Sequence, residues 1–543
     1  MVKNVELADW LAWAEEGWTV LPYLVKVSGE GGRLPASWKQ AWKAGSPYAF
    51  VLESGKGGRY TYLGLHPVSV LTGKGGSGEM LELATGQRTT AEGQPLELLE
   101  RWMRSFASPK VPGWPDFRGG CVGFLGYDVA RSLEQLPQLA SDEPGFPDYM
   151  WMRMEELWIY DHIEHALYCS VHAPVSWLDE GKEVRKTPER ERRELTASQK
   201  LRLEALLRDT NERARRMHAQ WRDMFGADQE NAAAEQLRNE RLEKAGELLG
   251  PKVEGWDRLE SDFPQEDFEQ AVLAIQEYIR QGDVFQVNLS VRRHLKLHAH
   301  PQDIYEWMRV LNPSPYMGYL TSPGFTLASG SPELLVKVRD DVVSARPIAG
   351  TRRRGANPEE DAAMEAELTG SEKERAEHIM LVDLERNDIG RIAAYGSVHV
   401  PELMTVERYS HVMHLVSQVE GKLSHGNNAY DVIAATFPGG TITGAPKIRT
   451  MEIIEELEPV TRGPYTGSMG WIDYNGDMEL NIIIRTLVVQ DGVGYIQTGA
   501  GIVIDSDPYR EYRECRNKAK ALVAALICSE EEAAAPAVHM GGN

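Results

Sequence analysis

Cysteines are scarce in this sequence, and long apolar runs are missing from it. The chain has 543 residues and four cysteines, which form no close pair and no CxxC motif. This usage argues against a thiolate metal site and favours a reducing, cytoplasmic setting. No apolar stretch reaches the roughly 20 residues that cross a membrane. The N-terminus lacks a basic start followed by an apolar stretch, so we expect no signal peptide and no membrane partner.

Basic residues are also in deficit. Lys and Arg together number 59 against 81 Asp and Glu, which gives a formal net charge of −22 at pH 7. A nucleic acid or an anionic membrane would require a basic surface, so we expect neither as a partner. An anionic substrate would have to be held by locally placed Arg and Lys side chains.

Composition divides the chain into four ranges. Residues 1–175 are rich in glycine, tryptophan and tyrosine and carry frequent turn signals, which predicts antiparallel strands with some helix. Residues 176–258 are dense in Glu, Arg, Leu and Ala, as in a charged helical connector or insertion. Residues 259–528 form the expected catalytic domain, and residues 529–543 resemble a disordered tail.

The start of the third range shows two clear periodicities. Apolar residues at helical spacing over 265–281, followed by Gly282, predict an amphipathic helix with a glycine C-cap. Strict alternation follows in VFQVNLSVRR. It predicts a strand that buries the face of Phe285 and Val287 and presents Gln286 and Asn288 to a cleft.

Two segments place glutamates one helical turn apart. Ser371 caps a predicted helix that carries Glu374 and Glu377, and Asp507-Pro508 begins another that carries Glu511, Glu514 and Lys518. Carboxylates on adjacent turns suit a hard, oxygen-preferring cation. Ordinary alternatives are a capping box for Glu374 and a surface ion pair between Glu514 and Lys518.

Three further segments could contact a ligand. FPGGTITGAPK, residues 437–447, combines glycines with Thr441, Thr443 and Lys447 as donors, although a tight strand-to-helix turn would explain it equally. The basic run RPIAGTRRRG, residues 346–355, is typical of a solvated loop. YSHVMH contains His411 and His414, and nothing local separates a catalytic role from a structural one.

In their joint order these segments resemble a known family. GDVFQVNLS, SGSPELL, RPIAGTR, KERAEHIMLVDLERND, YSHVMHLVS, FPGGTITGAPK, NIIIRTL, QTGAGIV and DSDPYREY are similar to the motif set of the chorismate-utilising enzymes. The resemblance covers roughly residues 262–527, and VLESGKGGRYTYLG and RGGCVGFLGYD extend it towards the N-terminus. It implies an α/β fold of the anthranilate synthase type. That fold is a two-layer sandwich of large antiparallel sheets with surrounding helices and an active site between the sheets.

The resemblance also implies roles for single residues. Mg²⁺ would bridge chorismate to Glu377 and Glu514, with Glu374 and Glu511 acting through metal-bound waters. The expected substrate-binding residues are Arg485, Tyr465, Gly499, Gly501, Thr441, Asn288 and Ala349, and the expected catalytic residues are Glu333, His414, Gln286, Thr351 and Lys518. Of these, Glu333 and His414 would transfer protons near the departing hydroxyl.

The residue at position 286 points to one branch of the family. Water-using members place a lysine there, which acts as a base towards water, whereas this chain has the neutral Gln286. Ammonia requires no such base, so the resemblance implies amination. Because the sequence shows no glutaminase domain, we expect a separate glutamine amidotransferase subunit to supply the ammonia.

Two sets of residues indicate different products. Ala349 and the segments at 52–54 and 312–317, which resemble a tryptophan feedback pocket, favour anthranilate and pyruvate. Asn288, Gly318 and the segment from Tyr465 to Leu487 resemble the aminodeoxychorismate synthase subunits of Bacillus-type bacteria. We therefore expect 4-amino-4-deoxychorismate, with anthranilate as the alternative. A non-catalytic binding partner is a third hypothesis, which the intact glutamate pairs, Arg485 and His414 argue against.

Overall fold

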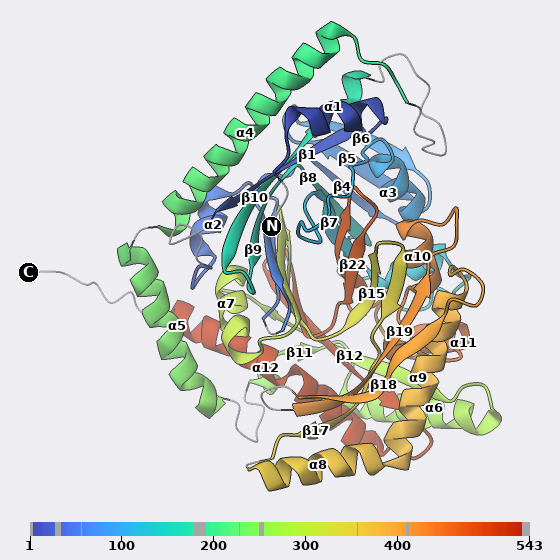
Figure 1. Ribbon diagram of the computed structural model, residues 1–543. Helices are drawn as coiled ribbons and strands as arrows, with labels where there is room; N and C mark the ends of the chain where they lie inside the picture. The colour runs from blue at the N-terminus through green and yellow to red at the C-terminus, as the bar shows by residue number, and fades with distance from the viewer. Residues whose placement is uncertain are drawn as a thin grey trace, which may run out of the picture.

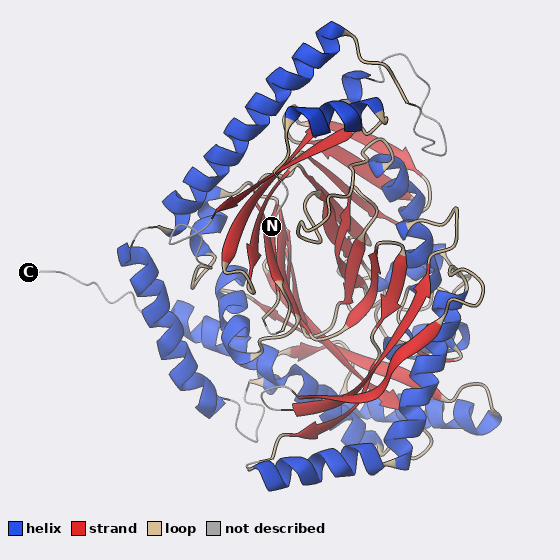
Figure 2. Cartoon of the chain, in the orientation of Figure 1, coloured by secondary structure: helices blue, strands red, loops and turns tan. Residues whose placement is uncertain are grey.

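Two facing sheets and a shell of helices form the molecule, as the computed structural model shows (Figure 1, Figure 2). The structure describes residues 4–27, 34–55, 57–178, 192–226, 228–248, 255–355, 357–408 and 412–534. Within these ranges, no helix is both long and apolar enough to cross a membrane.

The first sheet is built from antiparallel pairs and draws strands from both ends of the chain. Its central pairing joins β2 to β13, which lie more than 260 residues apart in sequence. The order across the sheet is β1 (Val20–Val27), β10 (Ala166–Pro174), β9 (Glu156–Asp161), β3 (Tyr60–Gly64), β2 (Ala49–Glu53), β13 (Tyr316–Ser322), β14 (Phe325–Ser331), β23 (Thr486–Gln490), β24 (Val493–Ile502), β12 (Gln286–Lys296) and β11 (Glu260–Ser261), with β20 (Gly444–Ala445) also paired to β12.

The second sheet is also antiparallel and also draws strands from both parts of the chain. The order is β17 (Ile348–Arg353), β19 (Val412–Lys422), β16 (Val342–Ala345), β15 (Leu334–Arg339), β22 (Met478–Ile482), β21 (Ser468–Asp473), β7 (Gly120–Leu125), β8 (Tyr149–Met154), β4 (Ser69–Lys74), β5 (Ser77–Glu82) and β6 (Gln87–Glu92), with β18 (His399–Arg408) also paired to β19. Both sheets therefore combine strands from residues 1–175 and from residues 259–528. The division into four ranges stays a prediction.

The helices cover the outer faces of the sheets. Those that lie on the side of the first sheet are α1 (Leu7–Glu15), α2 (Lys39–Ala44), α4 (Ala197–Phe225), α5 (Asp228–Leu248), α6 (Gln265–Gln281), α7 (Pro301–Leu311), α11 (Lys447–Leu457) and α12 (Pro508–Ala534). The second sheet is covered by α3 (Pro95–Met103), α8 (Pro358–Gly370), α9 (Glu372–Gly390) and α10 (Ala429–Thr436). Short 3₁₀ turns span Tyr127–Ser132, Ser176–Leu178, Trp256–Arg258 and, as η5, Gly440–Ile442.

An apolar layer joins the two sheets face to face. Phe124 of β7 stacks on Phe325 of β14 with ring centroids 5.3 Å apart, and Tyr62 of β3 packs against Trp471 of β21 at 6.3 Å. Two further apolar clusters lie between each sheet and its helices. The expected two-layer sandwich with surrounding helices is thus confirmed.

Most local predictions are confirmed. Gly282 ends α6 in the left-handed conformation, with φ 85°. Ser371 caps α9 by accepting a hydrogen bond from Glu374 N, and Asp507 caps α12 by accepting one from Arg510 N at 2.9 Å. Helices were expected in the range 176–258, and α4 and α5 lie there.

Two local predictions are wrong. Phe285 is 70% exposed and lies just before β12, which begins at Gln286. The predicted tail begins too early, since α12 continues to Ala534 and buries Ser529 against the body. The rest of the predicted tail, residues 535–543, lies outside the described residues.

Candidate active site

A cavity of about 310 Å³ opens between strands of both sheets. β12 and β24 form its floor, and β17, α9, α12 and η5 complete its wall. It brings together sequence-predicted site residues that are spread over more than 230 positions: Gln286, Asn288, Glu333, Ala349, Thr351, Glu377, Thr441, Tyr465, Arg485, Gly499, Gly501 and Lys518.

Strand alternation explains the floor of the cavity. Gln286 and Asn288 point into it, while Val287 and Leu289 are buried in the core beneath α6 and α12, as the sequence predicted. On β24, a Cβ at Gly499 would lie 2.7 Å from Asn288 Oδ1 and 2.8 Å from Tyr465 Oη. Only glycine leaves room there, so the backbone itself forms the surface that a ligand would meet.

Glu333 is the most perturbed acid of the cavity. It lies between β14 and β15 and is almost completely buried. Burial raises the pKa of its carboxyl to about 7, although Thr441 and the positive charges of Arg485 and Lys518 oppose the shift. Both protonation states are therefore populated near neutral pH, as a proton-transfer group requires.

Arg485 supplies a buried positive charge in the same cavity. Its backbone has a φ of 50°, in the left-handed region, and its carbonyl accepts a hydrogen bond from Gly330 N at 3.1 Å. Burial lowers the pKa of its guanidinium, while Glu333 opposes that shift. An arginine in this setting remains charged and gains most by binding an anion such as a carboxylate.

His414 lies behind the wall of the cavity. Its Nδ1 is 3.0 Å from Thr351 Oγ1 and 3.4 Å from the carbonyl oxygen of Gly350. Burial lowers the pKa of the imidazole, so the ring is neutral at neutral pH. Thr351, which does line the cavity, connects this ring to it. His411, the other histidine of the motif, lies outside the described residues.

The four glutamates lie at different depths. Glu377 lines the cavity, whereas Glu374, Glu511 and Glu514 do not. Glu374 accepts a hydrogen bond from Arg352 at 3.0 Å, and Glu511 accepts one from Ser506 Oγ at 2.7 Å. Glu514 pairs with Lys518 at 3.7 Å, and both side chains are about half exposed. Among the described residues no three His, Cys, Asp or Glu side chains lie close enough together to hold a metal.

Two expectations about basic residues are wrong. The run at 346–355 is for the most part the strand β17 and not a loop, and its arginines form ion pairs at the surface: Arg352 with Glu367 at 2.9 Å and Arg354 with Asp361 at 2.7 Å. Lys447 points away from the cavity and pairs with Asp388 at 2.6 Å. The threonine beside it, Thr443, is buried, so Thr441 alone of the three donors lines the cavity.

Sequence reasoning missed the cavity residue Gln497, and it also missed a perturbed carboxyl outside the cavity, Glu385. Gln497 lines the cavity, and its alternation with Gly499 and Gly501 along β24 was a signal that could have found it. Glu385 is buried on α9, and burial, followed by the charge of Asp388, raises its pKa to about 8. Its position in the sequence carried no such signal.

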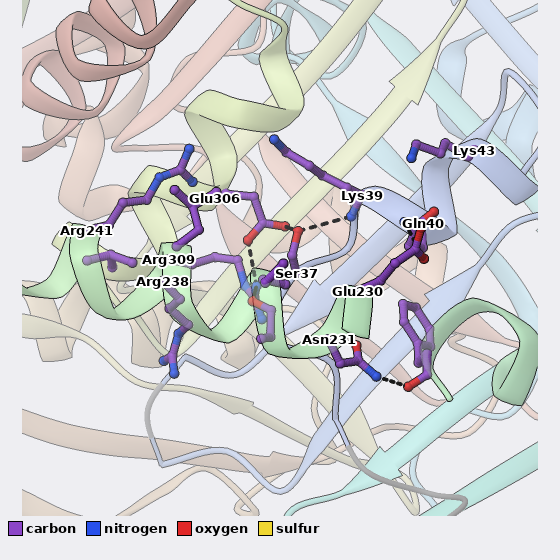
Figure 3. Close-up of a pocket in the computed structure, with 16 residues that line it drawn as sticks. Ser37, Lys39, Gln40, Lys43, Glu230, Asn231, Arg238, Arg241, Glu306 and Arg309 are labelled. Carbon is purple, nitrogen blue, oxygen red and sulfur yellow. Dashed lines mark hydrogen bonds and ion pairs between the residues drawn. The ribbon is translucent and has the colours of Figure 1, made fainter. Parts of the chain in front are cut away.

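Two other cavities lie away from these residues. The segments that resemble a tryptophan pocket meet at a cavity of about 780 Å³, lined by Leu52, Glu53, Ser54, Tyr316 and Met317 among others. A third cavity, of about 290 Å³, lies between α2, α5 and α7 (Figure 3). There the carboxylate of Glu306 accepts hydrogen bonds from Ser37 Oγ at 3.0 Å and from Arg309 at 2.7 Å.

Comparison with known proteins places this arrangement in a family. Residues 48–524 match the family of chorismate binding enzymes. The chain belongs to this family.

Two sequence relatives and one crystal structure are similar to this chain over most of its length. The aminodeoxychorismate synthase component 1 of Bacillus subtilis is 44% identical over 89% of this chain and 92% of its own length. The anthranilate synthase component 1 of Acetivibrio thermocellus is 40% identical over 89% of this chain and 90% of its own. The crystal structure of anthranilate synthase component I from Streptococcus pneumoniae superposes on this chain with a TM-score of 0.66 at 32% sequence identity. The superposition covers 86% of this chain and 93% of the Streptococcus pneumoniae chain.

Proposed function

We propose that this chain is the synthase subunit that aminates chorismate to 4-amino-4-deoxychorismate, the precursor of p-aminobenzoate and folate. A separate glutamine amidotransferase subunit supplies the ammonia in the cytoplasm. The observation that carries the proposal is the neutral Gln286 on the floor of a cavity that also holds Glu333 and Arg485. The 44% identity to a component 1 of aminodeoxychorismate synthase supports the choice of product.

Some cavity residues would bind the substrate, and others would transfer protons. Chorismate carries two carboxylates, and Arg485 and Lys518 are the cationic side chains that line the cavity within the described residues. Amination exchanges the C4 hydroxyl for ammonia and releases water. Hydroxide is a poor leaving group, so it must receive a proton, which Glu333 holds near neutral pH. Gln286 offers an amide and no base, which leaves water unactivated.

Mg²⁺ is the proposed cofactor. Its donors would be carboxylates of α9 and α12, chiefly Glu377 and Glu514, and hard oxygen ligands of this kind fit the ion. A cluster of three protein ligands is not required, because Mg²⁺ takes one or two carboxylates together with waters and substrate oxygens. The bound ion would neutralise a substrate carboxylate and polarise it. Glu374, held by Arg352, would accept hydrogen bonds from the ion's waters.

Product analysis tests the proposal directly. We expect the purified chain, given chorismate, Mg²⁺ and ammonium salt at high pH, to form a product that an added lyase converts to p-aminobenzoate. Glutamine should replace ammonium only after an amidotransferase is added. Stoichiometric anthranilate and pyruvate with no lyase-dependent product would show anthranilate synthase instead, whereas no consumption of chorismate would indicate a non-catalytic partner.

One observation favours anthranilate synthesis as a second candidate function. Ala349 lines the cavity, and its methyl group leaves space beside the substrate where a lysine could have acted as a covalent nucleophile. Without that nucleophile, ammonia could add at C2 and remain there, and loss of pyruvate would then give anthranilate.

Exchange of Gln286 for lysine should change the nucleophile. Its side chain lies in the cavity, so the Gln286→Lys variant places an amine where it can accept a proton from water. We expect detectable isochorismate in a chromatographic assay without ammonium, and none from the wild type. A matched Gln286→Met variant, similar in length but without a base, should form none. A lysine variant that binds chorismate without yielding a hydroxylated product would contradict the role given to this position.

A further inference from the structure

The cavity of about 290 Å³ between α2, α5 and α7 has no part in the proposed function (Figure 3). We call it the helical cavity. It is separate from the candidate active site, because the two cavities share no lining residue. Its volume lies at the lower end of the range in which proteins bind small molecules. A ligand of the helical cavity would therefore be small.

One part of the wall is apolar and aromatic. The apolar side chains that line it are Phe225, Leu237, Val310, Ala36, Ala233 and Ala234. The ring of Phe225 packs edge-on against Trp38, with centroids 5.8 Å apart, and against Trp221 at 4.8 Å. Aromatic rings prefer such edge-to-face arrangements, so a ring placed beside Phe225 would extend an existing aromatic cluster.

The rest of the wall carries five cationic side chains, three of which are already paired. The pairs are Arg309 with Glu306 at 2.7 Å, Arg241 with Glu532 at 2.6 Å, and Lys39 with Asp303. The last pair ties α2 to α7, and Gln40 of α2 donates to Glu230 of α5 at 2.9 Å. These bonds hold the three helices around the cavity before any ligand enters, which lowers the entropy cost of binding.

The other two cations are Lys43 of α2 and Arg238 of α5. Both are exposed, and neither forms an ion pair or a hydrogen bond with another described residue. Figure 3 shows them at the cavity on different helices. Among the lining acids, Glu306 is bound by Arg309, which leaves Glu230 to oppose these two charges. In a chain of net charge −22, the mouth of the helical cavity is thus a local site of positive charge.

We propose that the helical cavity binds a small aromatic carboxylate. The ring lies against Phe225 and the apolar side chains of α5 and α7, and the carboxylate lies at the mouth, where Lys43 and Arg238 can reach it. A guanidinium fork suits a carboxylate geometrically. A neutral ring would leave the two cations without a counter-charge, and an inorganic anion would leave the apolar wall uncovered. The proposal does not depend on the reaction that the chain catalyses.

Calorimetric titration of the whole chain with benzoate tests the ligand class. The titration is made with saturating chorismate and without ammonium or Mg²⁺, so that the active-site cavity is filled. We expect saturable one-to-one binding with a dissociation constant of about 1 mM or below. Benzamide lacks the charge and acetate lacks the ring, so both should bind at least about tenfold more weakly. Absence of saturable benzoate binding, its displacement by chorismate, or equal binding of benzamide or acetate would overturn the proposal.

Two variants test the location. Ala234→Phe fills the cavity without a change of charge, and the double variant Lys43→Glu, Arg238→Glu reverses the charge at its mouth. The matched control is Lys200→Glu, Arg208→Glu on α4, which changes the net charge equally at two exposed side chains outside the cavity. We expect benzoate to bind at least about tenfold more weakly to both cavity variants and within about twofold of the wild type to the control.

Turnover of chorismate should match the wild type in all three variants, because none of the changed residues lines the active-site cavity. Unchanged benzoate affinity in either cavity variant would overturn the helical cavity as the binding site. Equal weakening in the control would assign the effect to net charge and would overturn it as well.

Discussion

Glu377→Ala is expected to reduce turnover of chorismate by on the order of 10³-fold, because the variant removes the only one of the four predicted magnesium ligands that lines the cavity. Mg²⁺ sites have few protein ligands, so the loss of one carboxylate weakens binding of the ion strongly. Glu514→Ala should have an effect of the same order. Glu514 is half exposed and bonded only weakly to Lys518, so this variant should also keep the wild-type melting temperature.

Titration with Mg²⁺ measures the effect. The activity of wild type should saturate with Mg²⁺, and the two variants should remain inactive at concentrations that saturate it. Matched controls lie on the same helices: Glu372→Ala on α9 and Glu531→Ala on α12 each remove an exposed carboxylate that does not line the cavity. Near-normal activity of either Glu377→Ala or Glu514→Ala at saturating Mg²⁺ would remove the metal assignment.

The fold was predictable where local rules and long-range packing agree. Ser371, Asp507 and Gly282 cap their helices through hydrogen bonds or backbone conformations that depend on a few neighbouring residues. The alternation of Gln286 and Asn288 gave the inward face of β12 for the same reason. Phe285 was mispredicted because a period of two specifies a face but not whether another element covers it.

Local rules of capping and alternation could not predict which strands pair when they are far apart in the sequence. β2 lies beside β13, and β7 beside β21, and no local pattern in sequence indicates these neighbours. The same limit applies to ion pairs: Lys447 looked available for a ligand, but Asp388, which binds it, lies 59 positions away. The resemblance identified the site residues, whereas the perturbed pKa of Glu333 depends on burial that only the assembled fold provides.

Glu333→Gln is expected to lower turnover by on the order of 10²–10⁴-fold, because glutamine keeps the shape of the side chain and removes the proton it transfers. In the wild type, burial raises the pKa of this carboxyl to about 7. The protonated form, which donates to the leaving hydroxyl, is therefore lost as pH rises through 7. Turnover measured at constant free ammonia should fall over that range, and the residual activity of Glu333→Gln should not.

The Glu333→Gln substitution should have the opposite effect on stability, which it should raise at high pH. The pKa of the Glu333 carboxyl is higher in the folded chain than in the unfolded chain. At low pH the carboxyl is neutral in both states and does not destabilise the fold. The free energy of unfolding therefore falls as pH rises from the pKa of the unfolded chain through about 7. A shift of this size corresponds to about 3 kcal/mol at high pH. Glu333→Gln should therefore raise the melting temperature at pH 8.5 and leave it nearly unchanged at pH 5.

Glu385→Gln provides the matched control for both measurements. Glu385 is also buried, and burial raises its pKa to about 8, but it does not line the cavity. We expect it to share the stabilisation at high pH and to keep turnover within a fewfold of the wild type. Equal loss of turnover in Glu333→Gln and Glu385→Gln would show that buried charge, and not proton donation at the substrate, accounts for the effect. A Glu333→Gln variant that is as active as the wild type at pH 7 would remove Glu333 from the mechanism.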